Sequence, residues 1–500
     1  MAPPVRPSRR SLLLLTIISS SYMSPWTCVG SLIPHYTSLY GPRYFTLLNA
    51  AFYTAGYPTA RMQTAMDEGY DRMLGPKKAF LVRMLTCTAF LAFYSFLAES
   101  VTLKDPNAMM LLTFLAGVAT WGSHGALTST ASMFQVEAVS YLQVGFMLPN
   151  VYCLALNRIY QTEYEGFFVV TGLIVLVGAA CSACLAMTRE ARDAQDGYMK
   201  DLDLRRELLS DDYGNGDGAV NGADAPDGDN RGAGMGGDGG EVNDENLLEG
   251  GSGARHPRPS KGAHDEEVGD GLLTSCDDVE TTASSSSSSS SSPSKRNLSS
   301  IVTLRNSGRG AGAPNPRSSY IEAVSMHRAV LFMTIFLSVF CGSFFSYVKP
   351  EVDAGGGGGE GAGYEITQVL YFSRLFSDLF GRFLTLLPRP KFLQDIRGLC
   401  YLLVPRVITT CLYFMYVSDL FPYPLSRSDV VVSVLVVLNG CHSGYSAVLS
   451  YQMAQEDVGF RGGREEGKIL ASKGMNESFH AACGIAAIAN LVVVFGGKGG

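Results

Sequence analysis

The chain has 500 residues, of which 46% are hydrophobic and only 17% are charged, a composition typical of a membrane protein. The formal net charge of −7 includes an acidic, glycine-rich central tract, so it gives no reason to expect a nucleic-acid partner. The 11 cysteines are odd in number and scattered, mostly within apolar runs, which argues against a disulfide framework and a structural zinc site. No metal or other cofactor is expected.

Apolar stretches of about 20 residues, long enough to cross a bilayer as helices, recur along the chain. Six precede the central tract: 11–39, 44–66, 79–97, 108–130, 141–160 and 166–187. Five follow it: 330–348, 366–387, 398–417, 430–454 and 469–495. We therefore predict an all-α polytopic membrane protein with eleven transmembrane helices.

Lysine and arginine in the connectors predict the orientation of these helices. The N-terminal tail and the connectors after the second, eighth and tenth spans are rich in basic residues, and the connectors opposite them are poor. The N-terminus is therefore predicted to be cytosolic and the C-terminus extracytosolic, in the plasma membrane or an internal one. Arg9 and Arg10 before the apolar run 11–18 also resemble the start of a signal peptide, although no clear cleavage site follows.

The middle of the chain divides it into two membrane halves. Residues 1–10 are a cytosolic tail, 11–188 hold helices 1–6, 189–327 are predicted to be a disordered cytosolic loop, and 328–500 hold helices 7–11. Glycine, aspartate and serine dominate the loop, so it cannot bury a core. It is interpreted as a flexible tether, or as a regulatory segment in which a kinase acts on the serine run 284–292 and on Ser294.

Two ionisable residues stand out in the eighth predicted span. Asp378 and Arg382 are four residues apart, on one helix face. Ionisable groups at membrane depth mark a solute pathway by default, and they equally suit a buried ion pair that fixes helix packing. Arg374 lies four residues before Asp378, and its long side chain could snorkel or line an outer vestibule.

Short motifs at particular helices make the interpretation more specific. They are Pro25-Trp26-Thr27 in helix one, Gln143 in helix five, Leu337-Ser338-Val339-Phe340 in helix seven, Asp378, Gly381 and Arg382 in helix eight, and Asn439-Gly440 in helix ten. In this order they resemble the equilibrative nucleoside transporter family. The resemblance covers both membrane halves and implies a six-plus-five, major-facilitator-like arrangement.

This sequence departs from the family pattern at several positions. Thr27 replaces the usual Asn, and Leu375 stands where an Asn commonly precedes the Asp. Trp121 takes the place of a fourth-helix glutamine that contacts the nucleobase in some members; it could stack on a base but not read its edge. These departures concern the range of substrates rather than the fold.

The resemblance implies a nucleoside or nucleobase as the solute. Such a solute needs an aromatic surface for the base and donors and acceptors for the ribose. Trp26 and Trp121, the two tryptophans, are candidate walls, with anchoring or packing as the alternative. Asp378 and Arg382 are candidate ribose partners. Asn439 offers an amide, or serves helix packing.

Three further residues are candidates for gating or proton coupling. They are His124, Arg374 and Glu477. His124 is equally interpreted as a satisfied core residue. Glu477 follows Lys473 and precedes His480 at helical spacing near the cytosolic end of the last span, which indicates a gate or an interfacial ion pair.

The sequence therefore predicts a transporter that works by alternating access, by facilitated diffusion or coupled to protons. No ATP-binding motif is present, and no enzymatic activity is expected. One alternative is a carrier of another small organic solute, such as a sugar or vitamin. A remote alternative is an intramembrane hydrolase with a Ser443–His480 dyad, although the Gly-x-Ser-Gly motif is absent.

Overall fold

The structure, a computed structural model, describes residues 5–102, 104–160, 164–214, 324–345, 348, 362–425, 428–460 and 465–496. These residues form helices and connectors, with no strand among them beyond one isolated bridge between Val5 and Phe134. The helices belong to one compact unit within residues 1–216 and 314–500. The prediction of an all-α chain is confirmed.

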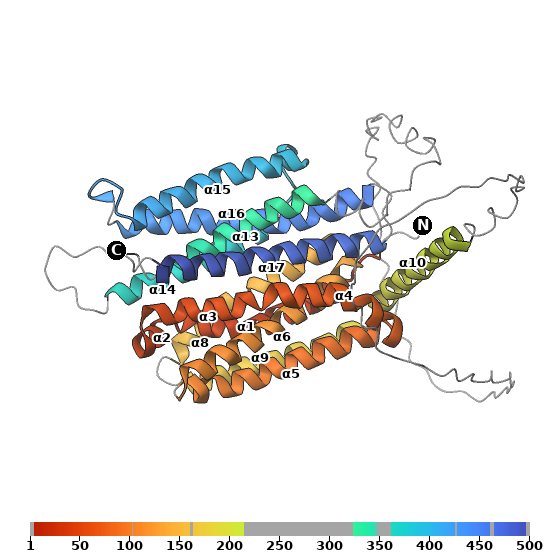
Figure 1. Cartoon of the computed structure of the whole chain (residues 1–500), viewed down its shortest axis with the longest axis horizontal. Coiled ribbons are helices and arrows are strands. Elements are labelled where there is room, and N and C mark those ends of the chain that lie inside the picture. The colour runs from red at the N-terminus through yellow and green to blue at the C-terminus, as the bar shows by residue number, and fades with distance from the viewer. Residues whose placement is uncertain are drawn as a thin grey trace, which may run out of the picture. The chain divides into compact units, whose positions relative to one another are not determined.

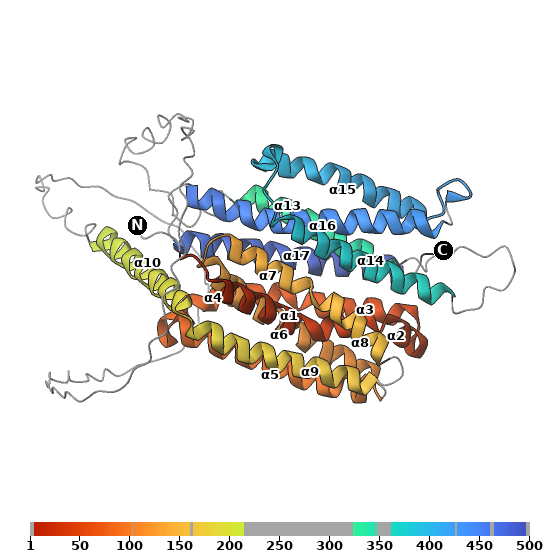
Figure 2. The same cartoon turned by 180° about the vertical axis from the view of Figure 1, so that it is seen from behind.

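The helices form a bundle in which most helix axes are roughly aligned with one another, parallel or antiparallel (Figures 1 and 2). Those before the central tract are α1 (Arg9–Ser31), α2 (Ile33–Tyr40), α3 (Pro42–Thr54), α4 (Gly56–Leu74), α5 (Pro76–Thr102), α6 (Pro106–Ser132), α7 (Glu137–Met147), α8 (Pro149–Ile159), α9 (Tyr164–Met187) and α10 (Arg189–Gly214). Those after it are α13 (Ser325–Gly342), α14 (Ala362–Leu384), the 3₁₀ helix η3 (Lys391–Leu393), α15 (Ile396–Val417), α16 (Asp429–Phe460) and α17 (Glu465–Gly496). We call α1–α9 the N-terminal group and α13–α17 the C-terminal group.

Three of the expected spans are each built from two helices rather than one. The chain breaks at Leu32 between α1 and α2, at Ala55 between α3 and α4, and at Leu148 between α7 and α8. In α2 and α8 a proline occupies the first turn, where its missing N–H costs nothing and its fixed φ favours a new helix start. Hydropathy does not detect such breaks, because the residues on either side stay apolar.

Nine helices in the described part of the chain are long and apolar enough to cross a membrane. The two remaining expected spans coincide with α3–α4 and with α14. The helices α3 and α4 are interrupted, and α14 carries Arg374, Asp378 and Arg382 within three turns. The total of eleven therefore stays a prediction.

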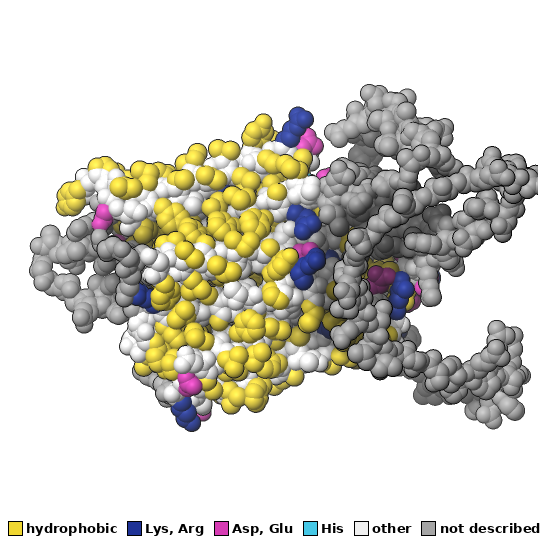
Figure 3. Space-filling model, viewed as in Figure 1, with side chains coloured by type: hydrophobic (Ala, Val, Ile, Leu, Met, Phe, Trp, Pro, Cys, Tyr) yellow, Lys and Arg dark blue, Asp and Glu magenta, His cyan; other side chains and the backbone are white. Residues whose placement is uncertain are grey.

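The outside of the bundle carries many exposed apolar side chains. Figure 3 shows hydrophobic side chains spread along the helices and charged ones mainly toward the two ends. Examples well exposed on different helices are Leu111, Leu173, Phe380, Tyr401 and Val492. An apolar belt of this kind requires a hydrocarbon surrounding, so the chain is a multi-pass membrane protein.

Helix α10 corrects the prediction that disorder begins at residue 189. Residues Arg189–Gly214 form a helix that packs against α17, α9 and α5. Its buried apolar side chains, Ala191, Ala194, Tyr198 and Leu202, recur every three or four residues, so one face is mainly apolar although the segment as a whole is polar. The serine run 284–292 and Ser294 lie outside the described residues.

Helices α14 and α16 pack closely because three glycines let their backbones approach. A Cβ atom at Gly444 would lie 2.0 Å from the carbonyl oxygen of Asp378, and one at Gly381 would lie 2.1 Å from that of Cys441. At Gly440 the nearest atom would be the hydroxyl of Ser377, at 2.1 Å. Small residues at membrane helix interfaces serve this purpose, and here they fix the position of the helix that carries Asp378.

Replacing Gly444 by Ala should therefore destabilise the protein, because the added methyl group meets backbone that has to move. We expect a loss of about 1–3 kcal/mol, as for other overpacked sites. Thermal unfolding in detergent, followed by size-exclusion chromatography, measures this loss. Gly484→Ala is the matched control, since the nearest atom to its Cβ would be 3.7 Å away. Equal stability of the two variants would contradict the close approach of α14 and α16.

Candidate functional site

A pocket lies between the two groups of helices. The cavity offers about 80 Å³ to the centres of water-sized spheres, and about 880 Å³ of empty space when open solvent around it is included. Its walls come from α1, α3, α6, α7 and α8 on one side and from α13, α14, α16 and α17 on the other. Five of the residues predicted from the sequence line it: Trp26, Trp121, Arg374, Asp378 and Arg382.

One wall of the pocket is aromatic. Trp26 stacks on Phe52, with ring centroids 4.1 Å apart and planes 6° from parallel, and Tyr53 meets it edge-on. Trp121 is 1% exposed, and its indole nitrogen donates to the carbonyl oxygen of Phe52 at 3.1 Å. Both tryptophans thus pack within the fold and also present ring surface to the pocket, so the two interpretations of them are compatible.

Asp378 and Arg382 form a buried ion pair. Nε of Arg382 donates to Oδ1 of Asp378 at 2.6 Å, and the two residues are 1% and 5% exposed. Nη1 of Arg382 also donates to Oε1 of Gln143 at 2.6 Å and to its backbone carbonyl at 3.1 Å. The pair therefore ties α14 to α7, across the two groups of helices. Oδ2 of Asp378 keeps no hydrogen-bond partner among the described residues and is available to a ligand hydroxyl.

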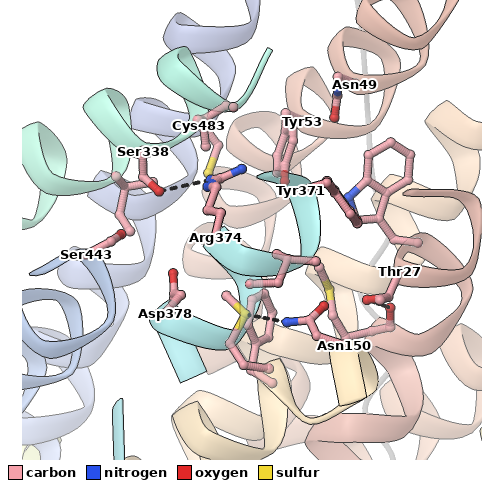
Figure 4. Close-up of a pocket in the computed structure, with 18 of the residues that line it drawn as sticks. Thr27, Asn49, Tyr53, Asn150, Ser338, Tyr371, Arg374, Asp378, Ser443 and Cys483 are labelled. Carbon is pink, nitrogen blue, oxygen red and sulfur yellow. Dashed lines mark hydrogen bonds between the residues drawn. The ribbon is translucent and has the colours of Figure 1, made fainter. Parts of the chain in front are cut away.

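Arg374 is half-buried in the pocket wall and stands apart from this pair. Figure 4 shows its side chain projecting from α14 toward Ser338 and Cys483. Nη2 of Arg374 donates to the hydroxyl of Ser338 at 2.9 Å. In the described part of the chain it makes no ion pair, so Asp378 pairs with Arg382 alone and Arg374 is a separate cation.

Asn439 lies outside this pocket, between α16 and α15. Its Nδ2 donates to the hydroxyl of Thr410 at 3.0 Å, and its carbonyl oxygen accepts a hydrogen bond of 2.8 Å from Arg406. These contacts fit helix packing, the alternative that the sequence left open.

Arg406 is an intramembrane charge that our sequence reasoning missed. It is completely buried in α15, and besides Asn439 it donates to the carbonyl oxygen of Thr334 at 2.7 Å. It is the sole charge of α15 beyond its first turn, and it follows Pro405. A charge inside an otherwise apolar run was the signal that could have found it.

Two buried histidines sit beside the pocket rather than in its lining. Nδ1 of His124 shares a hydrogen bond of 2.7 Å with the hydroxyl of Tyr22, and the His124 and His480 rings are 5.9 Å apart. The ring nitrogens of His480 and the hydroxyl of Ser443 have no hydrogen-bond partner among the residues that the structure describes. A nucleophile and its base need such a bond, so the geometry does not form the Ser443–His480 dyad.

Ion pairs join the two groups at the end of the bundle where α4 ends. Nζ of Lys473 lies 3.1 Å from Oδ2 of Asp67, and Nη1 of Arg61 lies 3.4 Å from Oε2 of Glu477. Both pairs link α4 to α17. On α17, Glu477 is two residues before Phe479, which lines the pocket, so this ion-paired end begins directly beside the pocket.

More polar contacts reinforce the ion-paired end. Arg83 of α5 pairs with Asp67 and with Asp71, whose Oδ2 accepts from the hydroxyl of Tyr198 in α10 at 3.4 Å. Burial raises the pKa of the Asp71 carboxyl, and the Arg83 guanidinium opposes that rise. Helix α10 thus packs on the same network. His480, expected near Lys473 and Glu477, lies instead among aromatic rings.

A separate contact joins the groups through α16 and α7. Nε2 of Gln452 donates to the hydroxyl of Ser140 at 2.6 Å. Arg389 holds Gln452 and also Glu456, whose carboxylate it meets with two hydrogen bonds of 2.8 and 2.9 Å. Two independent pairs of helices are therefore fastened across the groups at this end.

Removing the Lys473 side chain should loosen the ion-paired end. Asp67 is 4% exposed and keeps only Arg83 in the Lys473→Ala variant. Asp67 and Lys473 line a small polar cavity together with Gln63, Thr128 and Asn476. We expect a cysteine placed at Ser129, in the same cavity, to react with a membrane-impermeant maleimide about tenfold faster in this variant. Arg72→Ala, which breaks an exposed pair within α4, is the control. Unchanged labelling in both variants would show that the Lys473–Asp67 pair does not restrict access to position 129.

The sequence of this chain matches no family model and no curated protein. Its structure is similar to several solved transporters. The human organic anion transporter MFSD10 has a TM-score of 0.49 at 12% identity over 99% of this chain and 96% of that chain. The major facilitator superfamily proton:xylose symporter XylE has 0.49 at 9% over 98% and 89%, and the nucleoside transporter NupG has 0.44 at 10% over 97% and 98%.

Proposed function

We propose that this chain is a membrane transporter of small organic solutes, with nucleosides as the leading cargo. The observation that carries the proposal is the pocket between the two groups of helices, lined by aromatic rings and by the only charges of α14 beyond its first turn. Ionisable residues inside a membrane bundle, facing a cavity, are expected along a solute path. Packing alone requires no cavity there.

Alternating access is the mechanism that fits this arrangement. The ion pairs between α4 and α17 join the two groups of helices on one side of the pocket. Transport would require these pairs to separate as the two groups rock around the pocket. Arg382 contacts Gln143 across the two groups of helices. A solute that moves next to Asp378 would therefore alter that hydrogen bond and the packing of α14 on α7.

Nucleosides suit the chemistry of the pocket. Trp26 and Tyr53 offer ring surface on which a base can stack. Oδ2 of Asp378 can accept from the ribose hydroxyls, and the amides of Asn49 and Asn150 offer donors and acceptors. The order of motifs that resembles the equilibrative nucleoside transporters, including Gln143, supports the same cargo. Neither facilitated diffusion nor proton coupling is favoured by the contacts of His124, whose Nδ1 is engaged with Tyr22.

A sugar or a vitamin is the second candidate cargo. The same acceptors serve a sugar's hydroxyls, and aromatic rings also pack against the apolar face of a sugar ring. The two cargoes differ in what the tryptophans contribute: a base gains stacking over its whole face, and a sugar gains less.

Uptake of labelled uridine and adenosine in a transport-deficient host tests the leading cargo. We expect saturable uptake that unlabelled nucleosides compete and unlabelled glucose does not. If protein that reaches the membrane takes up neither nucleoside, the proposal that nucleosides are the cargo is wrong. Competition by sugars alone would favour the second candidate.

Asp378→Asn tests the site. The change leaves the Arg382 guanidinium buried without its counter-charge, a loss of about 3–5 kcal/mol when one partner of a buried pair is removed. Uptake per molecule at the membrane should fall at least about tenfold. Arg72→Ala, on the exposed face of α4, should transport normally. Normal uptake by Asp378→Asn would remove the ion pair from the transport mechanism.

A further inference from the structure

The pocket carries an unbalanced positive charge. The charged residues in its lining are Arg374, Asp378 and Arg382, two cations and one anion. Asp378 is committed to Arg382 at 2.6 Å. Behind the wall, the described part of the C-terminal group holds a further intramembrane cation, Arg406, bonded only to backbone carbonyls. The guanidinium of Arg374 therefore faces the pocket without a counter-charge.

The position of Arg374 is built by its surroundings. A Cβ atom at Gly342 would lie 2.3 Å from Nη1 of Arg374, so the absence of a side chain at 342 makes room for the guanidinium. Ser338, one turn earlier on α13, accepts from Nη2. Tyr53 and Cys483 flank it and are neutral (Figure 4). One hydroxyl is the only acceptor this donor-rich group has among the described residues, which leaves several N–H groups for a ligand.

A guanidinium in this setting favours one class of ligand. Its planar fork matches a carboxylate with two parallel hydrogen bonds, and such charge-assisted bonds are about twice as strong as neutral ones. In a membrane interior the attraction is screened less than in water. The neighbouring carboxylate does not cancel it, because Asp378 is already neutralised by Arg382.

We propose that the pocket selects solutes that carry a carboxylate, and that Arg374 is the residue that binds this group. The inference rests on the proposed function, because it assigns the cargo class of the same pocket. The aromatic wall and Oδ2 of Asp378 then hold the ring and hydroxyl groups of the solute, and Arg374 holds its acid group. A nucleoside or sugar whose terminal CH₂OH is oxidised to a carboxylate has all three features.

Tryptophan fluorescence reports binding at this site directly. The chain has two tryptophans, and both line the pocket. The probes are two matched pairs, uridine with uridine 5′-carboxylate and glucose with glucuronate, titrated against the purified full-length protein. In the wild type we expect the acid of at least one pair to bind about tenfold tighter than its neutral partner.

Three variants test whether Arg374 causes the preference for the acid over its neutral partner. Arg374→Lys keeps the charge and should retain the preference in part, while Arg374→Gln should bring the affinity ratio of acid to neutral partner close to one. Gly342→Ala keeps the arginine but displaces the far end of its flexible side chain, so it should lower the ratio without a change of charge. Because the ratio is taken within each variant, a general loss of affinity does not imitate the result.

The outcomes separate this inference from the proposed function. Equal binding of acid and neutral partners by the wild type, failure of both acids to bind, or a preference that survives in Arg374→Gln would each overturn it. If Arg374→Gln does not fold, the wild-type ratio and Gly342→Ala decide. Uridine uptake with no acid preference refutes the inference alone, and an acid preference without any nucleoside uptake refutes the nucleoside cargo alone.

Discussion

The ion pair between Asp378 and Arg382 is the interaction on which the rest of the arrangement depends. Two charges inside a membrane bundle are costly unless they meet each other and further hydrogen-bond partners. Arg382 satisfies that condition by pairing with Asp378 and reaching across to Gln143, so its remaining hydrogen bonds require α7 to be in contact with α14. The glycines that bring α16 against α14 hold the pair in place. The pocket exists in the space left beside this contact.

Charge is distributed unevenly along the bundle, with different consequences at the ion-paired end of α4 and in the pocket. At the end where α4 finishes, acids and bases are joined in ion pairs that link α4, α5 and α17. In the pocket the balance is broken by Arg374. An end that opens by exchanging ion pairs is compatible with a pocket that attracts the opposite charge, because Arg374 belongs to none of those pairs.

Much of the fold could be predicted from the sequence, because hydropathy reports directly on which segments a bilayer can hold. The expected span 79–97 lies within α5, and 166–187 lies within α9. The hydropathy pattern could not show the breaks at Leu32 and Leu148. A proline follows each break, and the packing of neighbouring helices decides whether the helix ends there. The pattern also hid α10, whose polar composition masks an apolar face that is defined only by what it packs against.

Pocket residues could be predicted where a residue type has few possible structural roles at membrane depth, as charged residues do. Asp378, Arg382 and both tryptophans line the pocket, and their roles in binding stay predictions. Asn439 suits packing and the pocket equally well in sequence, and only its contacts distinguish the two. Arg406 shows the limit of motif reasoning, since a lone charge was visible but belonged to no motif. Pairing partners such as Lys473 with Asp67 come from distant segments and depend on the tertiary fold.

Cross-linking the ion-paired end tests the central claim, that solute passes through the pocket as this end opens and closes. Cysteines at Arg61 and Glu477, in a background without the accessible native cysteines, can be joined by a short reducible cross-linker. The account predicts that exchange of labelled uridine across the membrane stops when the cross-link forms and returns on reduction. Exchange that continues at the same rate with the end joined would contradict it.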